Sequence, residues 1–315
     1  MLRNLSMIFS FTGLSLLLLT PFLTKIAQAK EGIISDYSDS EFKEYWYKNG
    51  AEISRFKLEQ ARYGEIHSGD AVLIYVTETF NPELQVKSDT PDESSVPILK
   101  LNATRKFYTG IYPYSIMTST FTAIDQSSIT NPLKITSSFQ EWCGHVFFQL
   151  NDKNNLYQIE SRSYFETESD RTFTEPKSIL EDGLWTLIRI HPDKLPTGKF
   201  RLFPSTTYSR LSHTPFKAHM ANGSFNPLKE KSLEGISLME YKLNYVDQHR
   251  RVKIVFEKKF PFRIQRWEDS HKSIMGDTIL TTKAFRTHTI MTDYWNKHRN
   301  IDRKLLEKLG LDGKQ

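Results

Sequence analysis

The sequence predicts a mainly β fold: a large curved antiparallel sheet, shaped as a half-barrel or open barrel, with one or two short helices. Three observations support this prediction. Runs of β-branched and aromatic residues recur at strand length, the segments between them have hairpin length, and helical periodicity is nearly absent. We expect about ten to twelve strands, and a sheet of that width rarely stays flat.

The strands are predicted in chain order from these runs. Asn49-Gly50 is typical of a two-residue hairpin turn between strands at 45–48 and 51–59, and Ser68-Gly69-Asp70 indicates a second turn. The polar run 88–95 predicts a surface loop. The remaining predicted strands are 71–80, 96–110, 114–124, 133–142, 139–150, 156–165, 198–205, 236–247, 251–258, 262–269 and 287–295.

Two short segments are predicted to be helical, and a third can form at most a brief helix. Ser38, with Glu41 three residues later, can cap one brief helix. The segment 178–190 offers apolar residues at helical spacing before Pro192, and we expect it to cover one opening of the curved sheet. Residues 300–310 form a short amphipathic pattern at the end of the sequence.

The first 29 residues have the pattern of a secretory signal. Arg3 gives a positive start, residues 7–23 are apolar, and Ala27-Gln28-Ala29 places small residues at the cleavage positions. We therefore expect a single β-rich domain at 30–315, exported to the periplasm or secreted in soluble form, and an uncleaved anchor is the alternative. No cysteine lies near this segment, so a lipoprotein is excluded, and no later run predicts a transmembrane domain.

Composition and charge narrow the function classes. The chain is 38% hydrophobic and 13% aromatic, which is enough to build a core. The formal charge is +5, and removal of residues 1–29 takes away two positive charges and leaves +3. This excess is too small to indicate a nucleic-acid partner. The sequence has no phosphate-binding or dinucleotide motif, so no cofactor is predicted.

The strand predicted at 139–150 holds the strongest candidates for chemistry. It places Glu141, Cys143 and His145 at alternate positions on one face, opposite a core face of Trp142, Gly144, Val146, Phe148 and Leu150. Cys143 is the only cysteine of the chain. A nucleophilic cysteine needs a base within about 3 Å, and two of these side chains could share a metal, but no further ligand motif completes a metal site. The interpretation with most support is an ordinary strand face.

The runs 45–80, 105–121 and 140–151 resemble a family of exported bacterial β-rich proteins of unknown activity. Some members carry the label septum formation inhibitor Maf. True Maf proteins are cytoplasmic nucleotide pyrophosphatases with an SxSxRR motif, and this chain lacks that motif. The runs 251–258 and 260–269 are similar to the closing hairpin of the half-barrels of periplasmic lipoprotein carriers, and this similarity implies a fold rather than an activity.

We predict a binding protein for an apolar or amphipathic ligand, such as a lipid, an acyl chain or an extended peptide. Aromatic residues are the candidates to line its cavity: Tyr108, Tyr112, Tyr114, Phe121 and Phe147. An enzyme that uses Cys143 and His145 is one alternative. A scaffolding protein that contacts cell-envelope components is the other.

Overall fold

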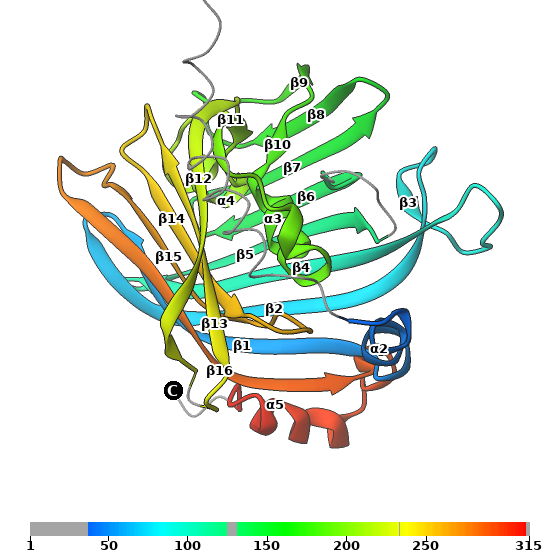
Figure 1. The fold of residues 1–315 in the computed structure, drawn as a ribbon. Coiled ribbons are helices and arrows are strands. Elements are labelled where there is room, and N and C mark those ends of the chain that lie inside the picture. The colour runs from blue at the N-terminus through cyan, green and yellow to red at the C-terminus, as the bar shows by residue number, and fades with distance from the viewer. Residues whose placement is uncertain (1–36, 125–130, 233, 313–315) are drawn as a thin grey trace, which may run out of the picture.

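One curved, open sheet contains every strand of the described chain, which confirms the predicted fold class (Figure 1). The computed structural model describes residues 37–124, 131–232 and 234–312, so the predicted signal segment 1–29 lies outside the described residues. All neighbouring strands are antiparallel except β10 and β11. The sheet has 16 strands, which is more than the number expected from the sequence.

The strands are β1 (Ala51–Arg62), β2 (Glu65–Asn81), β3 (Val86–Lys87), β4 (Val96–Thr109), β5 (Tyr112–Ala123), β6 (Lys134–Glu141), β7 (Gly144–Lys153), β8 (Leu156–Ser163), β9 (Arg171–Pro176), β10 (Ile179–Leu180), β11 (Gly198–Phe203), β12 (His219–Lys231), β13 (Ser237–Tyr245), β14 (Arg251–Glu257), β15 (Ile264–Lys272) and β16 (Ile279–Thr292). The helices and helical turns are α2 (Asp39–Lys43), η1 (Glu44–Lys48), α3 (Glu181–Ile190), η2 (Pro192–Lys194), α4 (Thr206–Leu211), η3 (Tyr294–Asn296), η4 (Asn300–Arg303) and α5 (Lys304–Lys308).

The first long strand of the chain, β1, and the last, β16, are neighbours in the middle of the sheet. The strand order runs β10-β11-β12-β13-β14-β15-β16-β1-β2-β4-β5-β6-β7-β8-β9, with β3 beside β2. β1 pairs with β16 on one side and with β2 on the other. The outermost strands, β9 and β10, are consecutive in the chain, so the two edges of the curved sheet meet where the chain passes from one strand to the other. We call the region between these edges the seam.

Two turns predicted from the sequence are in different places. Residues 44–48 form the helical turn η1 rather than a strand, and Gly50 at φ 81° leads directly into β1. A Cβ atom at Gly50 would lie 2.7 Å from the backbone of Thr292 in β16, so glycine is required by close strand approach as well as by φ. Gly69 lies inside β2, and the turn before that strand is Tyr63-Gly64, both at positive φ.

Helix α3 lies inside the curve of the sheet (Figure 1), where the segment was expected to cover an opening. Its residues Leu184, Leu187 and Ile188 are buried in the main hydrophobic core. Arg189, also in α3, donates to both carboxylate oxygens of Glu52 in β1 at 2.7 and 2.6 Å, and both side chains are 1% exposed. The helix is therefore fixed to the middle of the sheet by apolar packing and by a buried ion pair.

A second buried ion-pair group joins the start of α3 to the other half of the sheet. Arg250 donates to Glu181 at 2.6 and 2.7 Å and to Asp269 of β15 at 2.9 and 2.8 Å. Its guanidinium also lies 4.0 Å from the ring centroid of Tyr208 in α4. Buried charges are costly unless each one is paired. Here the guanidinium of Arg250 is paired with the carboxylates of Glu181 and Asp269.

Candidate functional site

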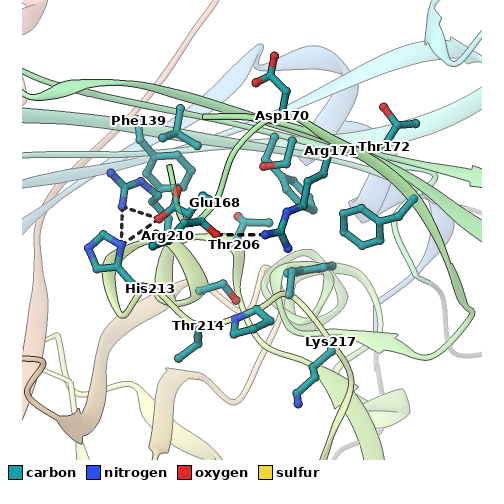
Figure 2. Close-up of a pocket in the computed structure, with 18 of the residues that line it drawn as sticks. Phe139, Glu168, Asp170, Arg171, Thr172, Thr206, Arg210, His213, Thr214 and Lys217 are labelled. Atoms are coloured by element: carbon teal, nitrogen blue, oxygen red, sulfur yellow. Dashed lines mark hydrogen bonds and ion pairs between the residues drawn. The ribbon is translucent and has the colours of Figure 1, made fainter. Parts of the chain in front are cut away.

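A large cavity lies at the seam of the sheet. It has a volume of about 720 Å³ and is lined by strands β6 to β9, by α4 and by residues 213–217 (Figure 2). At the seam, β9 and the irregular segment 214–217 both line the cavity.

Aromatic and aliphatic side chains form the apolar part of the cavity wall. Val146 and Phe148 point inward from β7, and Phe173 contributes from β9. Phe216 lies across the seam, with its ring centroid 4.8 Å from that of Phe148 and 5.0 Å from that of Phe203. These rings form a wall suited to an apolar ligand group.

Helix α4 positions the polar part of the wall. Ser205 caps its start by accepting a hydrogen bond from the Tyr208 backbone N–H at 3.0 Å. The helix ends in a pair of backbone bonds, from His213 to Arg210 at 3.3 Å and from Thr214 to Ser209 at 3.0 Å. His213 occupies the left-handed position of this end at φ 50°, where glycine is the usual residue. The strained backbone directs an imidazole toward the loop that precedes β9.

An ion cluster joins α4 to that loop. Arg210 contacts Glu141 of β6 at 3.0 Å and Glu168 of the loop at 3.2 Å, and the same oxygen of Glu168 lies 2.9 Å from Nδ1 of His213. Ser163 donates to the other oxygen of Glu168 at 2.7 Å. We call Glu141, Glu168, Arg210 and His213 the clasp.

The clasp determines the protonation of Glu168. Burial raises the pKa of this carboxyl, but hydrogen bonds from His213 and Ser163 and the positive charge of Arg210 outweigh burial and leave the pKa below its ordinary value. Glu168 is therefore ionised at neutral pH, and the loop is tied to α4 by charge-assisted hydrogen bonds.

Some hydrogen-bonding capacity beside the cavity is unused. Ser209 Oγ and Arg210 Nε are buried without a hydrogen-bond partner, and both residues line the cavity. Arg171, at the start of β9, points toward the centre of the cavity in Figure 2 and donates only to the Thr167 carbonyl at 3.1 Å among the contacts of its side chain. The cavity thus combines an apolar wall with polar and charged groups.

A second, smaller cavity of about 40 Å³ lies between α3, α4 and the inner face of the sheet. Asp182 lines it, is 7% exposed, and accepts hydrogen bonds at 2.9 Å from both the backbone N–H and the hydroxyl of Thr206. Burial raises the pKa of Asp182 to about 6, and the charge of Glu181 adds to this effect. The space suits a few water molecules rather than a ligand.

The structure separates the three residues that were expected to share one strand face. Trp142 and Cys143 form a two-residue hairpin turn between β6 and β7, so the prediction of one strand over 139–150 is wrong. Glu141 faces the interior and joins the clasp, whereas Cys143 and His145 are exposed. Trp142, expected in the core, is 69% exposed.

The turn explains this outcome. Glu141 pairs with Gly144 and Phe139 with Val146, so both members of each pair point to the same face. Alternation read straight through the turn groups Glu141 with Cys143 and His145, whereas Glu141 shares the buried face of Val146 and Phe148. No hydrogen bond joins Cys143 to His145 among the described side chains, so the turn does not provide Cys143 with a positioned base.

The aromatic residues predicted to line a cavity lie away from the one at the seam. Tyr108 and Phe147 are exposed, at 58% and 42%, and Tyr114 is buried at 2%. Tyr112 and Phe121 are half-buried. The hydroxyls of Tyr112 and Tyr114 belong to a cluster around Tyr63, at 3.3 and 2.9 Å. This cluster adjoins Arg62, which donates to the Tyr63 hydroxyl at 3.1 Å.

Most residues of the cavity were absent from the sequence-based candidates. Glu168 and Phe173 lie between the predicted strand 156–165 and the predicted helical segment 178–190, and Arg210, His213 and Phe216 lie between two predicted strands. One available signal was Ser205 before a short run without glycine or proline, which is a helix start.

Comparison with known proteins gives no further assignment. No protein family model, no curated protein and no solved structure matches this chain. Within the described ranges, no group of three or more His, Cys, Asp or Glu side chains is arranged to hold a metal ion. No helix of those ranges has the length and apolar character needed to cross a membrane. The resemblance to exported β-rich proteins stays a prediction.

Proposed function

We propose that this chain is an exported protein that binds an amphipathic ligand in the cavity at the seam. The observation that carries the proposal is the cavity itself, because its volume of about 720 Å³ falls in the range of small-molecule sites. The wall of Val146, Phe148, Phe173 and Phe216 would take the apolar part of the ligand, and the polar groups of α4 would face the other part.

Export is supported by sequence features alone. The positive start at Arg3, the apolar run 7–23 and the small residues before Lys30 fit a secretory signal.

Filling the cavity provides the test. Ser161 on β8 lines the cavity, whereas Gln158 on the same strand is exposed on the outer face. We expect Ser161→Trp to weaken the binding of dodecanoate or lauroylglycerol by about tenfold or more, because an indole would occupy the ligand's space. Gln158→Trp should leave binding unchanged.

Binding can be measured by displacement of 1-anilinonaphthalene-8-sulfonate fluorescence from the full chain, with urea unfolding of each variant as a check on folding. The proposal fails if neither amphiphile binds to the unaltered protein, or if both tryptophan variants bind as the unaltered protein does.

A further inference from the structure

Strand β9 and the irregular segment 213–217 border the cavity on facing sides. Arg171, Phe173 and Glu175 line it from one face of β9, and Thr172 lines it from the other face. Since residues of both faces line the cavity, the cavity borders an edge of this strand. Figure 2 shows this for β9, where Asp170 and Thr172 point to one side and Arg171 to the other.

Among the described residues, no strand pairs with the edge of β9 that borders the cavity. β9 pairs with β8 on its other edge, from Leu156 with Pro176 to Ser161 with Arg171, and it is the last strand of the sheet. With six residues it is also the longest outer strand, since β10 and β3 have two residues each. An unpaired strand edge presents a row of backbone N–H and C=O groups to any extended chain beside it.

We call the space beside the free edge of β9 the slot, and both of its ends are closed. At the Arg171 end, the clasp connects the loop before β9 to α4 through Glu168. At the Pro176 end, the chain crosses the seam into β10, and the Ser178 hydroxyl donates to the Arg201 carbonyl at 2.8 Å. The slot is therefore about as long as one short strand. It can accept one short peptide segment, but it cannot support the continued addition of strands to the sheet.

We infer that the occupant of the seam is an extended peptide segment that pairs with the free edge of β9 and so adds a strand to the sheet. This inference rests on the proposed function and narrows its ligand class. Strand addition to an exposed edge obtains affinity from backbone hydrogen bonds and specificity from alternate side chains.

The charges on β9 indicate which peptide fits. Arg171, Phe173 and Glu175 alternate along the strand and all line the cavity. Opposite charges directly across antiparallel strands stabilise pairing, as does an apolar residue opposite an aromatic one. An antiparallel partner should therefore place a basic residue opposite Glu175, an aliphatic residue opposite Phe173 and an acidic residue opposite Arg171. The peptide acetyl-Lys-Thr-Val-Thr-Glu-amide has this order.

The test uses backbone methylation of that peptide with the full-length protein. Only alternate residues of a strand bond to a given neighbour. Methylation of one alternate set of amides should therefore weaken binding by about fivefold to tenfold per lost hydrogen bond, and methylation of the other set should have little effect. Replacing the glutamate of the peptide by lysine should also weaken binding, because it sets two positive charges opposite each other at Arg171.

Amide hydrogen exchange of the protein provides a second readout. Peptide binding should slow exchange of amides in 171–176, whereas the edge strand β3, far from the seam in the strand order, should be unaffected. Equal binding of the two methylated sets, or unchanged exchange in β9, would overturn the inference.

The outcomes separate the inference from the proposed function. If dodecanoate binds and is lost in Ser161→Trp while no peptide binds, the cavity takes a lipid-like amphiphile and strand addition is refuted. If an amphiphile binds and the peptide binds with the alternating methylation pattern, both stand. If neither probe binds, both fail.

Discussion

Asp182 should make the protein less stable as the pH rises through the weakly acidic range. The carboxyl is buried beside Glu181, and its pKa is raised from the ordinary 3.8 to about 6. The folded state therefore holds the proton more tightly than the unfolded chain. The contribution of Asp182 is favourable at low pH, and it is lost progressively as the pH rises from about 4 to above 6.

The size of the effect follows from the shift. One pKa unit corresponds to about 1.4 kcal/mol, so ionised Asp182 reduces the free energy of unfolding by about 3 kcal/mol at pH 8 relative to a neutral side chain. Roughly half of this difference should be present at pH 5. Asp182→Asn keeps an oxygen that can accept both hydrogen bonds from Thr206, and it carries no charge.

Urea unfolding of the unaltered protein and of Asp182→Asn between pH 4.5 and 8 measures the difference directly, because other titrating groups are common to both. We expect the stability advantage of the asparagine variant to grow with pH and to level off above pH 6 to 7. Asp89→Asn, a change in the exposed loop 88–95, serves as the matched control. An Asp182→Asn difference that stays constant over this range, or that favours aspartate at pH 8, would refute the reasoning.

Two further predictions concern the interior and the hairpin turn. Glu52→Gln should reduce the free energy of unfolding by about 3–5 kcal/mol in urea titrations, because it leaves Arg189 buried without its counter-charge. The apolar pair Glu52→Leu with Arg189→Met should recover most of this loss. A loss below about 1 kcal/mol from Glu52→Gln would contradict a tightly paired interior. Because Cys143 is exposed, it should react with dithiobis(nitrobenzoate) in the folded protein at a rate similar to that in urea. Cys143→Ser should change the free energy of unfolding by less than about 0.5 kcal/mol. Slow labelling of the folded state would show that the turn is covered.

The regular strands could be predicted because their alternation is local. The runs at 71–80, 96–110 and 251–258 lie in β2, β4 and β14, and the capping pair Ser38 and Glu41 begins α2 as expected. β12 escaped prediction because Gly223 and Pro227 interrupt its pattern. Its register with β13 shifts after Pro227, which shows that long-range pairing rather than local preference holds this strand in the sheet.

The candidate site was less accessible from sequence for two physical reasons. Trp142-Cys143 forms a tight turn without the glycine, asparagine or aspartate that usually indicates one, so alternation was followed across a hidden reversal. The cavity also depends on where the sheet stops curling, which brings Phe173 and Phe216 together from segments with no shared periodicity. Of the chemical candidates, Glu141 alone reaches the site, through its bond to Arg210.

The pairing of β1 with β16 has a consequence for how the chain can be cut or assembled. Among the described residues, strands β2 to β9 and strands β10 to β15 form two blocks that strand pairing joins only through these two central strands. Loss of β16 would therefore divide the sheet into two halves with new open edges, rather than fray one margin. The strand pairs between β1 and β16 link residues more than two hundred positions apart, as in Ser54 with Thr289. We expect the two halves to pair late in folding, since pairing of such distant segments is slow. A chain that ends before residue 279 should expose two unpaired strand edges that can bind other chains, because its sheet lacks β16.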